Sequence, residues 1–333
     1  MDPLNKVISG KETSIKPVWL MRQAGRYLPE FRKIRRQNKN FIKLCLNEKL
    51  VPEITLQPLK RFNLDAAIIF SDILMLPYGL GQPVQFKKNF GPVLEDLEIN
   101  ILKKTNERIF IQRNKAVYKS MKKLSTKLKN KDKSLIGFAG APWTLLVYML
   151  NKKSPKKDIR PNILKDKKYV NEILKIIKKY LKIHIKQQVN NGANVIQIFD
   201  SWAGLVPNRS FDNYIVKPSH DIIKYVKTLG VPVIAFPRNI SNYKNYVDLV
   251  KPSAINIDYN VDPKKMEKKL NIPIQGGLDP KILLTNKKIL KSEIYKILSI
   301  FKDHPYIFNL GHGVLPQTKP SMVDYLVNTV KDF

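Results

Sequence analysis

The chain has 333 residues, of which 43% are hydrophobic and one is cysteine, and its formal net charge is +33. The single cysteine excludes an internal disulfide and a cysteine-rich metal site, and no apolar run reaches the roughly 18 residues that a membrane span needs. The first residues lack the apolar stretch of a signal peptide. We therefore expect a cytoplasmic α/β protein with one substantial core.

The positive charge is carried mainly by lysine, since 49 of the 60 basic residues are lysines and 11 are arginines. Many asparagines and isoleucines accompany the lysines, which is the composition that an AT-rich coding bias produces. A nucleic-acid-binding protein is the alternative from another class. Arginine behaves differently, because five of the 11 lie between residues 22 and 36. Their planar guanidinium groups can bind carboxylates in a bidentate way that lysine cannot reproduce.

Short apolar runs without polar alternation are typical of parallel strands that are covered on both faces. Eight such runs follow in chain order: Val18–Met21, Ala66–Phe70, Leu135–Ala139, Val195–Phe199, Val231–Phe236, Ala254–Ile257, Ile272–Ile274 and Tyr306–Leu310. Apolar residues three and four apart predict helices between them, and the clearest are Lys104–Leu128, Ile163–Asn190, Ile215–Leu229 and Pro280–Phe301.

Strands that alternate with helices eight times predict a single (β/α)₈ barrel domain over residues 1–333. A doubly wound open sheet is the alternative that periodicity does not separate from a barrel. We expect Pro77–Phe90 to form a long loop or a small hairpin, and the polar segment Asn151–Lys167 to form a surface loop.

Catalytic residues of such barrels follow the strands, and unusual polar residues do follow the apolar runs here. Arg22 and Arg26 are four residues apart, so in a helical turn both would project to one side and clamp carboxylates. A basic surface turn is the other interpretation. Asp72 lies between an apolar run and an apolar loop, where an acid is either a helix cap or a functional group.

Three further candidates follow later runs. Tyr148 comes after a glycine-containing segment, where its hydroxyl would face a cleft or pack in the core, and Ser201 follows the fourth run. His312 stands between two glycines, which favours a ligand-binding role over a packed histidine. The sequence contains no HExxH, CxxC or GxGxxG motif, and the serine does not lie in a GxSxG elbow.

Five segments, in this order, resemble the motifs of the uroporphyrinogen decarboxylase family. They are Pro17–Arg32, Ile68–Leu74, Gly137–Met149, Ile198–Gly204 and Asn309–Thr318. Small departures are Phe31 where the family often has tyrosine, Tyr259 where tryptophan is common, and Gly276-Gly277 where Gly-Asn is frequent; none is a proposed site residue.

The resemblance implies a (β/α)₈ barrel, a homodimer, and conversion of the small molecule uroporphyrinogen III to coproporphyrinogen III without a cofactor or metal. It implies that Asp72 stabilises the transition state, that Arg22 takes part in catalysis, and that no nucleic acid or membrane is a specific partner. The substrate site that it implies comprises Arg22, Gln23, Ala24, Gly25, Arg26, Asp72, Tyr148, Ser201 and His312. A corrinoid-dependent methyltransferase with zinc ligands is the nearest rival enzyme, but Cys45 has no histidine in a matching motif.

Overall fold

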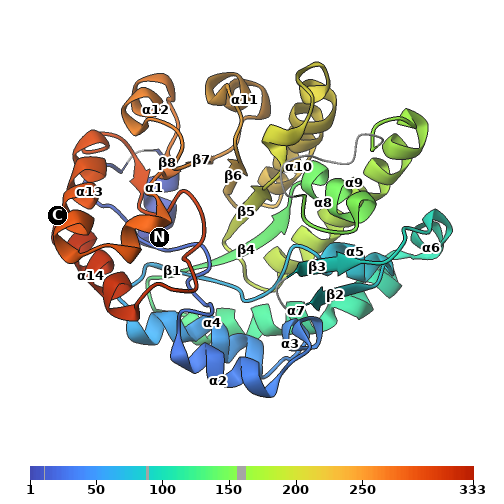
Figure 1. Cartoon of the computed structure of the whole chain (residues 1–333), viewed down its shortest axis with the longest axis horizontal. Coiled ribbons are helices and arrows are strands. Elements are labelled where there is room, and N and C mark those ends of the chain that lie inside the picture. Colours follow the sequence, from blue (N-terminus) through green and yellow to red (C-terminus); the bar gives the residue numbers. More distant parts are fainter. Residues whose placement is uncertain (11, 88–89, 156–162) are drawn as a thin grey trace.

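The core of the computed structural model, which describes residues 1–10, 12–87, 90–155 and 163–333, is a curled parallel sheet surrounded by helices (Figure 1). Seven strands pair in the order β1-β4-β5-β6-β7-β8-β9, which is also their order in the chain. A doubly wound sheet reverses its strand order at a switch point, so that alternative is excluded for these strands. The strands are β1 (Ala66–Ile68), β4 (Ser134–Gly140), β5 (Val195–Asp200), β6 (Val233–Pro237), β7 (Ala254–Ile257), β8 (Ile274–Gly276) and β9 (Tyr306–Ile307).

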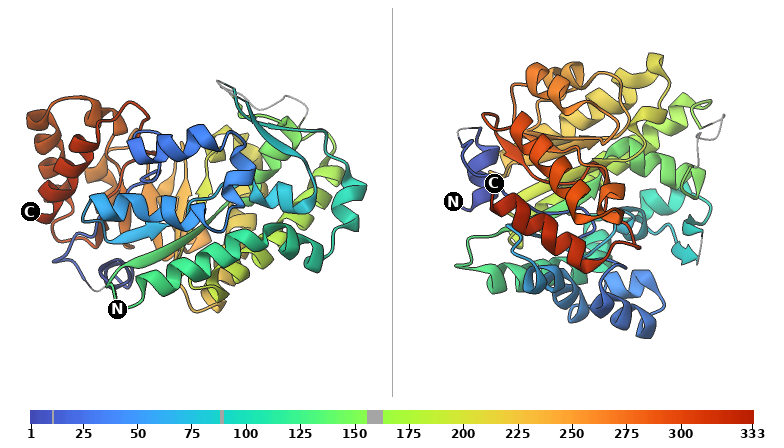
Figure 2. Two further views of the ribbon diagram at one scale, coloured as in Figure 1. Left: turned by 90° about the horizontal axis from the view of Figure 1, so that it is seen from below. Right: turned by 60° about the vertical axis from the view of Figure 1, so that its left-hand side comes forward.

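The helices lie outside the sheet, apart from the first, and most connect one strand to the next (Figure 1, Figure 2). They are α1 (Pro3–Ile8), α2 (Pro29–Gln37), α3 (Phe41–Cys45), α4 (Leu50–Arg61), α5 (Met75–Leu80), α6 (Ile99–Lys104), α7 (Glu107–Leu128), α8 (Pro142–Asn151), α9 (Lys167–Asn190), α10 (Lys217–Thr228), α11 (Tyr243–Val250), α12 (Pro263–Lys269), α13 (Lys287–Ile300) and α14 (Pro320–Lys331). No helix in the described part of the chain is both long and apolar enough to cross a membrane.

Three helices begin several residues later than predicted, because a polar residue caps each of them. The side chain of Asn106 accepts a hydrogen bond from a backbone N–H in the first turn of α7, and Asp166 and Asn286 do the same for α9 and α13. Such caps satisfy N–H groups that have no partner within the helix. The residues before each cap, which share the apolar periodicity, therefore lie outside the helix.

The first predicted strand is not a strand, and its residues make isolated contacts at both edges of the sheet. Val18 forms a single parallel bridge with Phe308, and the Phe308 N–H donates to the Pro17 carbonyl at 2.8 Å. On the other side, the Asp65 N–H donates to the Val18 carbonyl at 2.9 Å. The segment thus lies between β9 and β1 without the continuous ladder that a strand requires.

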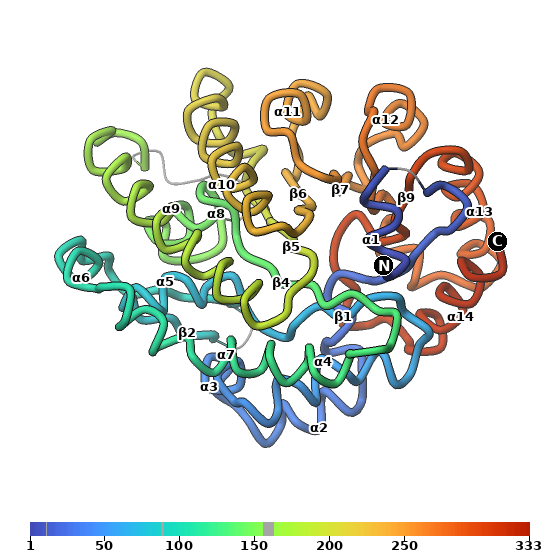
Figure 3. Tube along the Cα trace, turned by 180° about the vertical axis from the view of Figure 1, so that it is seen from behind, coloured from blue at the N-terminus to red at the C-terminus, as the bar shows by residue number. Residues whose placement is uncertain are grey.

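The inside of the curled sheet combines an apolar cluster with a polar layer. Leu4 and Val7 of α1 share the cluster with inward residues of the sheet such as Ile136, and Figure 3 shows α1 covering this end. Deeper in, Gln275 donates to Gln197 and Asn256 at 3.2 and 2.6 Å, and accepts from the Trp19 indole at 2.9 Å. These bonds satisfy the Gln275 amide, which would otherwise be costly to bury.

The segment Pro77–Phe90 contains the end of α5 and the first strand of a small hairpin, so the prediction of a hairpin is confirmed in part: the segment begins in a helix and the second strand lies beyond it. Its strands β2 (Val84–Lys87) and β3 (Gly91–Leu94) pair antiparallel, and Figure 2 shows them at one side of the sheet. Of the predicted loop Asn151–Lys167, residues 156–162 lie outside the described residues.

Candidate active site

The predicted site residues lie on segments that follow strands. Asp72 comes after β1, Ser201 directly after β5 and His312 after β9, while Tyr148 lies on α8, which begins two residues after β4. The C-terminal ends of parallel strands meet at one edge of a sheet. The fold therefore brings segments from both ends of the chain to the same edge.

A buried glutamine fixes the turn that carries Arg22. The Gln23 side chain is fully buried, its Oε1 accepts from the Leu20 N–H at 3.0 Å, and its Nε2 donates to the Ala66 carbonyl at 3.0 Å. The Tyr27 hydroxyl donates to the Gln23 carbonyl at 2.8 Å. Because its amide bonds within the protein, the Gln23 side chain positions the turn against β1 instead of facing a ligand.

Residues 22–26 do not form a helical turn, so the condition under which Arg22 and Arg26 would share a helix face is not met. Arg22 has a φ of 61°, in the left-handed region, and a bonded turn follows in which the Leu28 N–H donates to the Gly25 carbonyl. Ala24 is half-buried and packs against the core. Arg26 is exposed, yet its charge is close enough to lower the pKa of Arg22. The two guanidinium groups are thus neighbours through a tight turn and not through helical spacing.

Arg22 is exposed to solvent, and its guanidinium group lies close to Asp72. Burial lowers the pKa of its guanidinium and Asp72 opposes this shift, although the side chain keeps exposed surface. Its stem crosses Gly313, where a Cβ atom would lie 2.4 Å from Cδ of Arg22. Residue 313 therefore has to be glycine if Arg22 is to keep this position.

Asp72 is half-buried, and its Oδ1 accepts a hydrogen bond from the Leu74 N–H at 2.8 Å. Burial raises the pKa of this carboxyl to about 6, while the Leu74 bond and the charge of Arg22 act in the opposite direction. Asp72 is not the N-cap of α5, which is Leu74, but its side chain caps the turn that leads into this helix, and its carbonyl accepts from the Met75 N–H at 3.1 Å. At neutral pH the Asp72 carboxylate is therefore an anion close to the positive charge of Arg22.

Tyr148 lies near this carboxylate without bonding to it. Burial raises the pKa of its hydroxyl, and Asp72 adds to the shift. In the described part of the chain the hydroxyl pairs with Ser154 Oγ at 3.3 Å and makes no hydrogen bond to Asp72. The ring also packs edge-on against Trp202, with centroids 5.8 Å apart.

His312 is a neutral donor. Burial lowers the pKa of its imidazole to about 3, and the charges of Arg22 and Arg238 add to the effect. Its Nδ1 accepts a hydrogen bond from the Gly313 N–H at 2.7 Å, which places the ring proton on Nε2. The side chain can therefore offer an N–H to an anionic ligand without carrying a charge.

Ser201 is half-buried beside a buried hydrogen-bond network at the end of β5. The Thr144 hydroxyl donates to Asp200 Oδ1 at 2.6 Å and accepts from the Trp202 N–H at 3.2 Å. Burial raises the pKa of Asp200 to about 7. This hydrogen-bond network connects the segment of Ser201 with the first turn of α8, one turn before Tyr148.

Two residues of this edge were missed by the sequence reasoning. Arg238 directly follows β6 and forms an ion pair with Asp258, which directly follows β7, with Nε and Oδ1 3.5 Å apart. Arg238 also lowers the pKa of both Arg22 and His312. The rule that selected Asp72 and His312, a polar residue just after an apolar run, also points to both missed residues.

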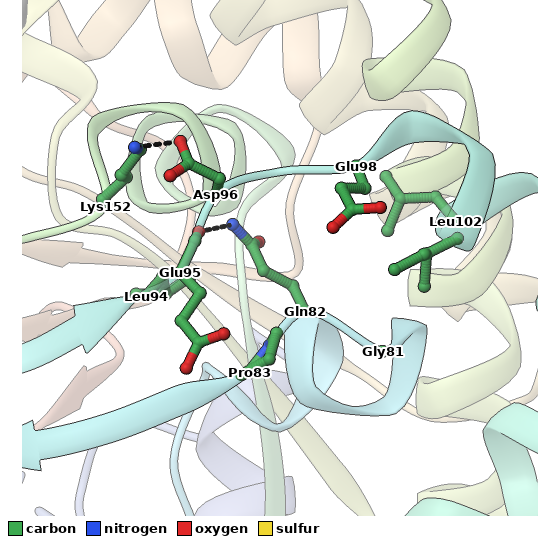
Figure 4. Close-up of a pocket in the computed structure, with 10 residues that line it drawn as sticks. Gly81, Gln82, Pro83, Leu94, Glu95, Asp96, Glu98, Leu102 and Lys152 are labelled. Atoms are coloured by element: carbon green, nitrogen blue, oxygen red, sulfur yellow. Dashed lines mark hydrogen bonds and ion pairs between the residues drawn. The ribbon is translucent and has the colours of Figure 1, made fainter.

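A separate hollow of about 320 Å³ lies beside the hairpin (Figure 4). Glu95, Asp96 and Glu98 line it, and Asp96 pairs with Lys152. An acidic lining would repel a carboxylate ligand, and none of the predicted site residues contributes to it. Among the described residues, no three His, Cys, Asp or Glu side chains group closely enough to hold a metal ion.

A curled parallel sheet with arginines, a carboxylate and a neutral imidazole on segments that follow its strands defines a barrel-like α/β enzyme suited to an acidic small molecule. The chain belongs to the uroporphyrinogen decarboxylase family, because the family model described as "Uroporphyrinogen decarboxylase (URO-D)" matches residues 1–333. A uroporphyrinogen decarboxylase of Rickettsia bellii is 44% identical over 329 residues, covering 95% of each chain. One of Rickettsia felis is 41% identical over 327 residues, covering 95% of this chain and 92% of the relative.

A solved structure described as a methyltransferase from Methanosarcina mazei shares the fold. The two superpose with a TM-score of 0.80 over 98% of this chain and 96% of the other, at 16% sequence identity. At that identity the likeness extends to the fold alone.

Proposed function

We propose that this chain removes CO₂ from the four acetate side chains of uroporphyrinogen III and so produces coproporphyrinogen III for haem biosynthesis. The observation that carries the proposal is the match to the decarboxylase family over residues 1–333. The substrate has eight carboxylates, and Arg22 and Arg26 offer bidentate donors for them. Ser201 and Nε2 of His312 add neutral donors, and Tyr148, Ala24 and Gly25 complete the substrate site.

The reaction needs a sink for the electron pair that remains when the carboxylate leaves. Protonation of the ring carbon that bears the acetate makes the pyrrole cationic. The bond to the carboxyl carbon then breaks, and its electrons form an exocyclic double bond and neutralise the ring. The methylene carbon takes up a proton and the ring carbon returns its own, so each cycle consumes one proton and releases one CO₂.

Asp72 is the proposed stabiliser of the cationic ring. Its anion would accept hydrogen bonds from the pyrrole N–H groups and oppose the positive charge where it develops. Arg22, or a water molecule that it orders, is the proposed proton donor. A guanidinium is ordinarily a very weak acid, and the lowered pKa of Arg22 acts in the direction that proton donation requires.

Three finer features accompany the proposal. Residues 17–21 are proposed to close the gap between β9 and β1 and so complete a barrel without forming a regular strand, supported by their isolated contacts with Phe308 and Asp65. The functional unit is proposed to be a homodimer in the cytoplasm.

Turnover of the pure substrate tests the function. Metal-stripped protein is incubated with anaerobically reduced uroporphyrinogen III, and the products are oxidised and separated by carboxylate number. Stepwise seven-, six-, five- and four-carboxyl species are expected from the wild type. Asp72→Ala should abolish most turnover, by about two to three orders of magnitude, and Asp72→Glu should retain some. No product from folded wild-type protein would reject the function, whereas near-normal rates for Asp72→Ala would reject only the role of Asp72.

A further inference from the structure

The backbone of Arg238 is fixed at the edge of the sheet that carries the site. Its N–H donates to the Asp200 carbonyl at 3.0 Å, and its own carbonyl accepts from the Gly204 N–H at 3.0 Å. Both partners belong to the segment that contains Ser201. Arg238 is thereby tied to the end of β5 as well as to the end of β6.

Close contacts connect Arg238 to Arg22 around the same edge. Asp258, the ion-pair partner of Arg238, precedes Tyr259, whose backbone N lies 2.2 Å from where a Cβ on Gly311 would stand. Gly311 precedes His312, and Gly313 carries the stem of Arg22. These contacts form a continuous path from one arginine to the other, with the imidazole between them.

The ion pair holds Arg238 without neutralising it fully. Asp258 is fully buried, and the Arg238 side chain keeps 17% of its surface. The 3.5 Å between Nε and Oδ1 is too long for a good hydrogen bond, and both atoms are without a hydrogen-bond partner among the residues that the structure describes. The second carboxylate oxygen of Asp258 is occupied by the Asn239 N–H and the Tyr243 hydroxyl. A guanidinium held in this way retains donors for a further anion.

We propose that Arg238 binds a carboxylate of the tetrapyrrole substrate as a third arginine of the site, and that Asp258 positions its guanidinium group. The inference rests on the proposed function, since the ligand is the polycarboxylate substrate of that reaction. Three arginines on two separate segments, with Arg22 and Arg26 in one turn and Arg238 after β6, would contact carboxylates at different edges of one macrocycle, which a single flexible lysine could not do with the same geometry.

The test compares Arg238→Met and Arg238→Lys with the control Arg108→Met, which removes an exposed arginine of α7. We expect Arg238→Met to raise the KM for uroporphyrinogen III by about tenfold to a hundredfold, as loss of a charge-assisted contact predicts, with a smaller change in kcat. Arg238→Lys should recover only part of the loss, and Arg108→Met should match the wild type. The Kd of the oxidised octacarboxylate uroporphyrin III, measured by fluorescence quenching, should follow the KM values.

Removing Arg238 leaves Asp258 as an unpaired buried charge, which itself destabilises a fold. The double variant Arg238→Met/Asp258→Asn removes that charge and separates binding from folding. A folded double variant with wild-type KM and Kd would overturn the inference. A wild-type chain that makes no product would instead reject the proposed function, and the Kd comparison would still decide whether Arg238 holds an octacarboxylate.

Discussion

The stem of Arg22 lies across the backbone of Gly313, so closely that a Cβ atom at residue 313 would stand 2.4 Å from Cδ and 2.7 Å from Cγ of the arginine. Gly313→Ala should therefore displace Arg22 and lower kcat/KM by at least about tenfold, since a misplacement of about 1 Å at a reacting centre can cost a hundredfold.

The control for Gly313→Ala is Gly230→Ala. Gly230 has a φ of +76° and open space around its Cβ position, so alanine there should lower the unfolding midpoint and leave turnover intact. If Gly313→Ala kept wild-type kcat/KM, the close contact with Arg22 would be irrelevant to catalysis.

The pKa of Asp72, raised to about 6 by burial, predicts an acid limb in activity. Above pH 6 the carboxylate is anionic and can oppose a cationic ring, and below it the group is protonated and the effect is lost. We expect kcat/KM to fall as the pH decreases through about 6. The pH profile of Asp72→Asn should lack this limb at a uniformly low rate, and an unchanged limb in that variant would assign it to another group.

Arg26→Lys should weaken substrate binding although it keeps the charge, because the bidentate fork is lost. We expect the KM for uroporphyrinogen III to rise several-fold with little change in kcat. Arg36→Lys, the same substitution at an exposed position of α2, is the matched control. Equal KM values for the two variants would refute the carboxylate contact of Arg26.

His312 should stay neutral throughout the working range, because burial and two nearby arginines lower its pKa to about 3. Long-range ¹⁵N NMR spectra should show its Nδ1 unprotonated and its shifts constant between pH 5 and 8. The half-buried His220, whose Nδ1 lies 2.9 Å from the Leu249 carbonyl oxygen, offers a second imidazole in the same spectra for comparison. Titration of the His312 signals within that range would contradict the assigned donor state.

Asp200 should make stability depend on pH. Its folded-state pKa of about 7 lies above the ordinary value of 3.8, so the folded chain holds a proton that the unfolded chain has released. The free energy of unfolding is highest, as far as Asp200 is concerned, below about pH 4. It decreases as the pH rises toward 7, by up to about 1.4 kcal/mol per pH unit. Asp200→Asn should gain stability relative to the wild type over that window in urea unfolding, and parallel curves would show that Asp200 ionises normally.

The apolar runs predicted the strands of the sheet, because a strand that is buried on both faces is apolar at consecutive positions. All seven strands of the sheet overlap a predicted run, and Ala254–Ile257 agrees residue for residue. Val18–Met21 has the same composition but only one bridge, because strand pairing depends on partners hundreds of residues away. The composition of a segment does not indicate which residues of the sheet it pairs with.

The candidate site, like the sheet, could be predicted from the sequence only in part. Polar residues after apolar runs indicated Asp72, Ser201 and His312, whereas the backbone of Arg22 did not follow from spacing, since a left-handed φ depends on the bonds that Gln23 makes. Arg238 follows the run Val231–Phe236 after only one further residue, and no glycine or tryptophan drew attention to it. Its relevance depends on Asp258, a partner that only the fold brings near.

The contact between Arg22 and Gly313 joins two segments that are far apart in the sequence, so the ribosome releases one of them long before the other. A ribosome releases the segment of Arg22 long before β9 exists, and domains complete their folding as the remaining residues emerge. The early segment has to wait without its partner, and a chain interrupted before residue 306 could form most of the sheet and still lack the site. Enzyme activity would therefore indicate that translation has passed residue 313, which the helix content of the chain would not.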